Sequence, residues 1–334
     1  MRFLYFTDTH IRGTNPQNRL DSFPETLHKK INEVIDIAKY YKADVLLHGG
    51  DIFDRPDISP SLVRQFVLLL KKSPFPIYVV AGNHDIYGQN PLTINRTMLG
   101  LLDSTGVINI IKQDEMKFFE DGNIKIQLTG RSYSYGIDTD DGFKSYIVKK
   151  DQKANYAVHM VHGMLLAKPF FKDMAYTLID DIIETQADIT LCGHYHTGFG
   201  VKKLNGKYFV NPGGLVRINN SINELLRMPK VVLFEIKESG INIEEITLKT
   251  ALPGHEVLDR SKLEAMSFKE KKLAEFVQSV YTTGEYNTVD ISTIIDKISQ
   301  EDNLKPEVIE EALNRIGFIE EVLSSTGDNF VEVS

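Results

Sequence analysis

The chain has 334 residues, of which 42% are hydrophobic and 25% are charged, and its formal net charge is −8. This composition is typical of a folded globular protein and excludes the collagen-like and intrinsically disordered classes. No run of 18 uninterrupted apolar residues occurs, an acid follows early at Asp8, and Cys192 is the only cysteine. We therefore expect a soluble, cytoplasmic protein with no signal peptide, no membrane span, no intrachain disulfide and no cysteine-based zinc site.

The charge is distributed unevenly along the chain. From His255 to the end there are 8 Lys and Arg against 17 Asp and Glu, whereas residues 1–254 are almost neutral. The acidic tail is a poor surface for nucleic acid, because a phosphate backbone attracts basic side chains. The first part could become such a surface once cations are bound to it.

Short apolar runs and helical patterns alternate along the first half of the chain. Runs rich in Val, Ile, Leu, Phe and Tyr predict buried strands at 2–7, 44–48, 77–81, 156–161 and 189–192. Apolar residues at helical spacing predict helices around 27–38 and at 61–72. This alternation is typical of an α/β fold. A second β-rich set is predicted at 116–120, 124–129, 207–210, 231–237 and 241–248.

The pattern changes after Pro253-Gly254, where only helices are predicted, at 261–281, 289–300 and 306–323. We therefore expect two domains, a catalytic domain at 1–252 and an acidic helical region at 253–334. The apolar positions of this region have two interpretations: the helices pack on the catalytic domain, or they bind a partner protein.

Polar segments follow each of the five predicted strands in the first set. In open α/β sheets, ligands bind beyond the carboxyl ends of the strands, so these segments could converge on one site. They are Asp8-Thr9-His10, Gly50-Asp51-Ile52-Phe53-Asp54, Gly82-Asn83-His84-Asp85, His162-Gly163 and Gly193-His194-Tyr195-His196.

The residue types in these segments indicate a metal site. Carboxylate, imidazole and amide oxygen ligands suit divalent ions such as Mn, Fe or Zn. Two ions about 3.5–4 Å apart need a bridging carboxylate, for which Asp51 is the candidate, and a hydroxide between the ions would be the nucleophile. His84 could protonate the leaving oxygen or stabilise the transition state.

In this order, the motifs D-x-H, G-D-x-x-D, G-N-H-D, a lone H and G-H-x-H resemble those of the calcineurin-like metallophosphoesterases. The resemblance implies a four-layer α/β/β/α sandwich, here followed by a small all-helical C-terminal appendage. It also implies that Asp8, His10, Asp51 and His196 hold one metal ion. The second ion would be held by Asp51, Asn83, His162 and His194.

Within this family, several segments resemble the SbcD-type nuclease subunit: 8–11, 19–23, 50–56 followed by 59–61, 79–85 and 211–217. The narrower resemblance, which covers roughly residues 1–250, implies a manganese-dependent DNA exo- and endonuclease of DNA repair. Such a protein is usually a homodimer, and it partners an SbcC-type coiled-coil ATPase through its C-terminal helices.

The chain also departs from this pattern. Asp54 stands where archaeal and eukaryotic relatives usually carry a histidine; the aspartate is similar to bacterial members and to phosphatases, where it orients the histidine matched by His84. The all-helical tail differs from the mixed α/β cap that usually follows. A phosphatase or phosphodiesterase for small nucleotide-type substrates is therefore the alternative function. A non-enzymatic scaffold is disfavoured, because every expected ligand is present.

Two further features have more than one interpretation. Arg217, in the glycine-rich segment, is the arginine that we expect to contact a substrate phosphate. The aromatic pair Tyr133 and Tyr135 could stack on a nucleotide base, although packing in a core or loop is the default for such residues.

Overall fold

A computed structural model describes residues 1–139, 141–169 and 174–261, together with a few single positions further on. The chain divides into two compact units, Met1–Arg260 and Ser261–Ser334. The helices predicted at 261–281, 289–300 and 306–323 lie almost entirely outside the described residues. Within the described part of the chain, no helix is both long enough and apolar enough to cross a bilayer.

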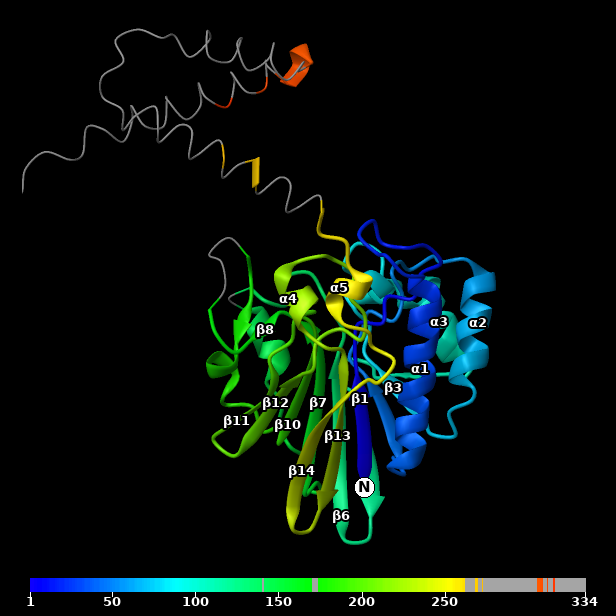
Figure 1. The fold of residues 1–334 in the computed structure, drawn as a ribbon. Helices are drawn as coiled ribbons and strands as arrows, with labels where there is room; N and C mark the ends of the chain where they lie inside the picture. Colours follow the sequence, from blue (N-terminus) through cyan, green and yellow to red (C-terminus); the bar gives the residue numbers. More distant parts are fainter. Residues whose placement is uncertain are drawn as a thin grey trace, which may run out of the picture. The chain divides into compact units, whose positions relative to one another are not determined.

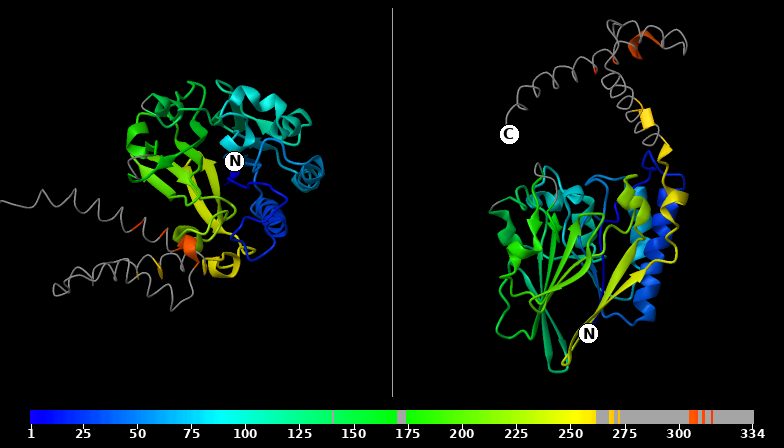
Figure 2. Two further views of the ribbon diagram at one scale, coloured as in Figure 1. Left: turned by 90° about the horizontal axis from the view of Figure 1, so that it is seen from above. Right: turned by 60° about the vertical axis from the view of Figure 1, so that its left-hand side comes forward.

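The first unit is built on two six-stranded sheets (Figures 1 and 2). In the first sheet β1 to β4 are parallel, and β13 and β14 form an antiparallel hairpin beside β1. Its strands, in spatial order, are β14 (Gly240–Thr247), β13 (Lys230–Lys237), β1 (Arg2–Phe6), β2 (Val45–His48), β3 (Ile77–Val79) and β4 (Asn109–Ile110).

The second sheet has four parallel strands with an antiparallel strand at each edge. The order is β11 (Gly200–Leu204), β12 (Lys207–Asn211), β10 (Ile189–His194), β7 (Tyr156–Gly163), β6 (Ile124–Arg131) and β5 (Met116–Asp121). A small parallel pair, β8 (Leu165–Leu166) and β9 (Thr177–Leu178), lies apart from it. All predicted strands are present, but they are divided between the two sheets.

The alternation of side chains along β1 explains how the layers are held together. Phe3 and Tyr5 face the second sheet in the inner core, where Phe3 stacks on Phe234 at a centroid distance of 4.9 Å. Leu4 and Phe6 point the other way, into the core beneath the helices. Since both faces of the strand are covered, the run from Phe3 to Phe6 is apolar throughout.

Helices α1 (Phe23–Tyr40) and α2 (Pro60–Leu70) cover the outer face of the first sheet. Both start with a serine at the N-cap and a proline in the first turn, which is the usual start signal. Short elements complete this side, namely η1 (Asn83–Asp85), η2 (Pro91–Arg96) and α3 (Met98–Ser104).

The outer face of the second sheet is covered mainly by loops and two short 3-10 helices, η3 (Gly142–Tyr146) and η4 (Ile179–Ile182). Tyr146 and Ile182 pack there against Val161, Cys192 and Phe209. The predicted four-layer architecture is confirmed, with a fourth layer thinner than the first.

The first unit continues past the predicted boundary at 252. Beyond α4 (Ile222–Leu226), the short helix α5 (Gly254–Val257) lies against the loop after β1, where the amide of Leu20 donates to the carbonyl of Val257. Val257 and Leu258 are both buried. The turn at Pro253-Gly254 is thus part of the first unit.

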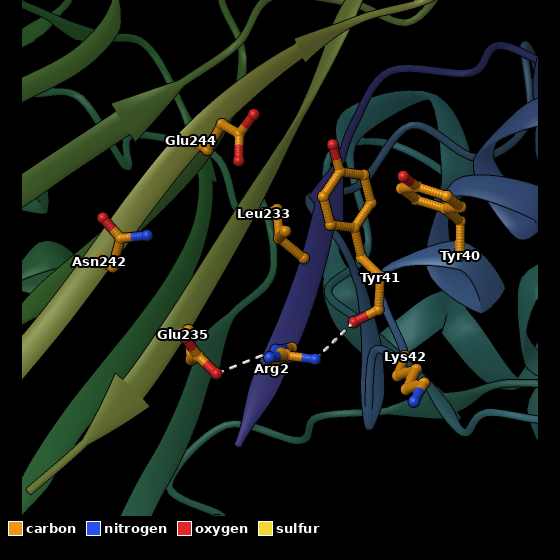
Figure 3. Close-up of a pocket in the computed structure, with 8 residues that line it drawn as sticks. All are labelled: Arg2, Tyr40, Tyr41, Lys42, Leu233, Glu235, Asn242 and Glu244. Carbon is orange, nitrogen blue, oxygen red and sulfur yellow. Dashed lines mark hydrogen bonds and ion pairs between the residues drawn. The ribbon is translucent and has the colours of Figure 1, made fainter.

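A shallow groove of about 500 Å³ opens at the amino ends of the strands, away from the motif segments (Figure 3). Arg2 lies between Glu235 and Tyr41, where its Nε donates to Glu235 at 2.9 Å and its Nη1 donates to the carbonyl of Tyr41 at 3.0 Å. These bonds join β1 to the neighbouring hairpin and to the end of α1.

The stack between Phe3 and Phe234 gives a test of the inner core. Phe234→Ala should lower the free energy of unfolding by about 3–5 kcal/mol, because it leaves a cavity between the two sheets. Urea unfolding followed by circular dichroism measures this loss. Phe118→Ala is the control, since Phe118 is partly exposed on an edge strand, and it should cost much less. Equal unfolding midpoints for the two variants would contradict the assigned core.

Candidate metal centre

The five motif segments meet at the end of the sandwich where β1, β2, β3, β7 and β10 finish (Figure 1). Three of these strands belong to the first sheet and two to the second. Main-chain hydrogen bonds join the first two segments, since the amides of Asp8 and His10 donate to the carbonyls of Gly50 and Asp51 at 3.1 and 3.0 Å. The site therefore spans the boundary between the sheets.

One set of converging side chains consists of Asp8, His10, Asp51 and His196, whose ligand atoms lie within 4.8 Å of one another. The Nε2 atoms of His10 and His196 are 3.0 Å apart. Nε2 of His10 is 3.6 Å from Oδ2 of Asp51, and Nε2 of His196 is 3.6 Å from Oδ1 of Asp8. Three of the four side chains are completely or almost completely buried.

A second set consists of Asp51, His162 and His194, joined by Asn83. Nε2 of His162 lies 3.3 Å from Oδ2 of Asp51 and 3.2 Å from Oδ1 of Asn83. Nδ1 of His194 lies 2.9 Å from the same oxygen of Asn83. Oδ2 of Asp51 therefore belongs to both sets, and all seven side chains that the sequence suggested as ligands come together.

The backbone of the site is strained in a way that aims these side chains. Asp8, His10, Asp51 and His194 have φ angles of 52°, 42°, 53° and 76°, in the left-handed region that residues with a Cβ rarely adopt. Each such residue costs about 1–3 kcal/mol, and residues of this kind cluster at functional sites. Gly82 is required nearby, because a Cβ there would collide with the carboxylate of Asp51.

Burial keeps most of the imidazoles neutral. It lowers the pKa of His10 and of His194 to about 3, so that both rings offer nitrogen lone pairs. For His162, burial also opposes the charge, but Asp51 outweighs it and raises the pKa to about 9. Nδ1 of His162 donates to the carbonyl of Gly49 at 2.8 Å, which turns Nε2 toward Asp51 and Asn83.

The donor set fits divalent cations. Two carboxylates, four imidazoles and one amide oxygen converge in a buried space. Burial, together with the charge of Asp51, raises the pKa of Asp8 to about 7 despite the opposing effect of His162, so a nearby cation would favour its ionised form. Oxygen and imidazole ligands suit Mn, Fe or Zn.

His84 lies beside both sets and is fixed by two hydrogen bonds. Its amide donates to Oδ1 of Asp51 at 2.9 Å, and its Nδ1 donates to the carbonyl oxygen of Asp54 at 2.9 Å. The second ring nitrogen, Nε2, is thereby left for a substrate. The carboxylate of Asp54 instead accepts from Nη1 of Arg12 at 3.2 Å.

Arg217 does not have the role that we expected from the sequence. Its side chain is only 1% exposed, and its guanidinium donates to the main-chain carbonyls of Leu252 and Arg227. Because it is buried and directed away from solvent, it cannot contact a substrate phosphate. It instead ties the glycine-rich segment to the chain around Leu252.

Asp85 is a residue whose function the sequence did not reveal. Its buried carboxylate accepts from the amides of Gly82 and Phe53, both at 2.9 Å, and of Ile52 at 3.2 Å. It thus locks the loop that carries Asp51 to the loop that carries Asn83. The only sequence signal is its place at the end of the G-N-H-D motif.

Tyr133 also lies at the site, whereas Tyr135 does not contact the ligands in any described interaction. The ring of Tyr133 is 5.4 Å from the ring of His194 and 6.1 Å from that of His162, measured between centroids. It is half-buried and packs against the neighbouring apolar cores, so packing accounts for its position.

Curated relatives of this chain include proteins of DNA repair. The DNA double-strand break repair protein Mre11 of Thermoplasma acidophilum is 24% identical over 328 residues, which is 90% of this chain and 81% of that protein. The SbcD component of the nuclease SbcCD of Escherichia coli K12 is 28% identical over 111 residues, 32% of this chain and 26% of that protein. The uncharacterized metallophosphoesterase YhaO of Bacillus subtilis is 24% identical, over 59% of this chain and 48% of that protein. The last two matches thus span less than half of the relative.

Among solved structures, a dimetal phosphatase from Danio rerio is similar, with a TM-score of 0.47 and 11% identity over 74% of this chain and 98% of that one. The model of the family described as calcineurin-like phosphoesterase matches residues 1–198, which is more than half of the chain and contains all seven converging side chains. This protein therefore belongs to the calcineurin-like phosphoesterase family, whose members are hydrolases.

Proposed function

We propose that this protein is a metal-dependent DNA nuclease that hydrolyses phosphodiester bonds, as an exonuclease, an endonuclease or both. The observation that carries the proposal is the shared Oδ2 atom of Asp51, which joins two ligand sets at one buried point. DNA is the proposed substrate because the relatives include a double-strand break repair protein and a component of a nuclease.

The residues that would hold two divalent ions are the two sets described above. Asp8, His10, Asp51 and His196 form one, and Asp51, Asn83, His162 and His194 form the other. We propose Mn²⁺ as the resident ion. When bound, such ions polarise a phosphate and lower the pKa of water, which supplies a nucleophile at neutral pH.

The other groups of the site would position the reacting atoms and protonate the leaving oxygen. His84 is fixed through its amide and Nδ1, so that Nε2 can donate a proton to the leaving oxygen or a hydrogen bond to the phosphate. Asp51 supports this geometry with Oδ1 while Oδ2 faces the ligand sets. Asp85 holds both loops without contacting the substrate.

Two further parts of the proposal concern assembly. By analogy with SbcD-type nucleases, an SbcC-type coiled-coil ATPase would bind the C-terminal helices, and the protein would form a homodimer. The helical region is also the acidic part of the chain, so it suits a protein partner better than DNA.

A metallophosphatase or phosphodiesterase of small nucleotide-type substrates is the second candidate. It would use the same ligands, and Asp54, which replaces the usual histidine of archaeal and eukaryotic nucleases, favours it. The two functions differ in substrate and not in the metal centre.

The nuclease proposal is tested with end-labelled linear and closed circular DNA in Mn²⁺, Mg²⁺ or chelator, beside a chromogenic phosphodiester. We expect Mn²⁺-dependent loss of DNA, and a decrease of about 100-fold or more in kcat for His84→Ala. His255→Ala is the control, because that side chain is 76% exposed and outside the site. Hydrolysis of the small ester with intact DNA would favour the second candidate.

The ligand assignment is tested by metal content after dialysis against Mn²⁺. The wild-type protein should bind two ions per chain, His194→Ala about one, and Asp51→Asn fewer than one, since Asp51 serves both sets. Asp57→Asn, an exposed carboxylate in the neighbouring loop, should bind two ions. Two ions retained by Asp51→Asn would rule out its bridging role.

A further inference from the structure

Nδ1 of His10 is a buried nitrogen with no hydrogen-bond partner. The His10 side chain is completely buried, and its other nitrogen, Nε2, faces His196 and Asp51 in the first ligand set. Buried polar atoms are almost always paired, so an unpaired one at a functional site calls for a physical explanation.

The carboxylate nearest to this nitrogen belongs to Asp54. Oδ1 of Asp54 lies 3.9 Å from Nδ1 of His10, about one ångström beyond hydrogen-bond distance. The same oxygen accepts from Nη1 of Arg12 at 3.2 Å, which holds the carboxylate on this side. The Asp54 side chain is only 18% exposed, so water competes weakly for it.

His84 makes its hydrogen bond without the carboxylate of Asp54. Its Nδ1 is already satisfied by the main-chain carbonyl of Asp54, a contact that does not depend on the side chain at position 54. The family pattern would give the aspartate side chain to the histidine of the G-N-H-D motif. Here the side chain of Asp54 and its carbonyl face two different histidines.

The chemistry of the imidazole ring connects these observations. A neutral histidine that coordinates a cation through Nε2 carries its ring proton on Nδ1, which then requires an acceptor. A carboxylate in that position fixes the plane of the ring and makes the ligand nitrogen more basic. Asp54 is placed to serve His10 in this way after a small side-chain movement.

We propose that Asp54 is a positioning residue for the metal ligand His10: its carboxylate accepts a hydrogen bond from Nδ1 of His10 and so sets the metal affinity of the first ligand set. Arg12 keeps the carboxylate in place and balances its charge. The inference rests on the metal centre of the proposed function and is independent of DNA as the substrate.

A separate cation held by His10, Asp54 and His84 is the competing explanation, because these three side chains also lie within 4.8 Å of one another. Arg12 argues against it, since its guanidinium already donates to Oδ1 of Asp54 and would repel a further cation. The cluster thus contains its own positive group.

The test measures Mn²⁺ binding by isothermal titration calorimetry in Asp54→Ala, Asp54→Asn and the control Asp57→Asn. We expect Asp54→Ala to weaken one of two binding events by about 10–100-fold, the range found when such supporting partners of metal ligands are removed. Asp54→Asn should weaken it less, because the amide oxygen can still accept. Asp57→Asn should bind as the wild type does. Equal affinities in all four proteins would overturn the proposal.

A double-mutant cycle that combines Asp54→Ala with His84→Ala shows whether Asp54 acts through His10 or through His84. If Asp54 acts through His10, the loss of Mn²⁺ affinity in Asp54→Ala persists in the His84→Ala background. If its carboxylate serves His84 instead, Mn²⁺ affinity is unchanged and the effect of Asp54→Ala on kcat disappears in that background, which overturns the proposal. A wild-type protein that binds no Mn²⁺ would overturn the metal centre itself, and would be recognised before any variant is compared.

Discussion

Asp51 places a carboxylate in a space with almost no access to water, where an isolated charge is costly. Burial alone would raise its pKa, but the imidazoles around it, His162 and His10 foremost, hold the pKa well below the usual range. The fold has to bring these histidines to Asp51 from different strands and from both sheets. The left-handed backbone at the ends of the strands and the close approach of Gly82 follow from this requirement.

Much of the architecture could be predicted from local pattern, because strands covered on both faces are mostly apolar, as residues 3–6 and 156–161 are. The division of similar runs between two sheets could not, since it depends on pairing between distant segments. Strand β11 gave no signal, because its lysines are exposed at an edge and its conformation comes from pairing with β12. The first unit runs to Arg260, beyond the predicted boundary at 252, because contacts such as the burial of Val257 and Leu258 and the bond from the amide of Asp259 to the carbonyl of Asn18 are not visible in a local pattern.

The convergence of the side chains in the candidate metal centre could be predicted from residue types at the ends of strands, whereas contacts made to the main chain could not. Ligand types at the ends of strands pointed to Asp8, His10 and the others. The role of Arg217 was misjudged, because its partners are main-chain carbonyls that no spacing reveals. For the same reason, the sequence suggested a side-chain contact between Asp54 and His84 where the structure has a carbonyl.

The side chains of the candidate metal centre come from both sheets, so different interactions hold the sheets together at the two ends of the sandwich. At the amino ends of the strands, the apolar side chains of the inner core hold the two sheets together. At the other end, the two sheets meet through Asp51, His162 and the neighbouring side chains of the candidate metal centre. Cations bound there would link the two sheets, and this link would be lost when the cations dissociate. Amide hydrogen exchange in this protein should therefore be graded along the strands, with the fastest response to metal concentration at the carboxyl ends of β7 and β10 and almost none near Phe234.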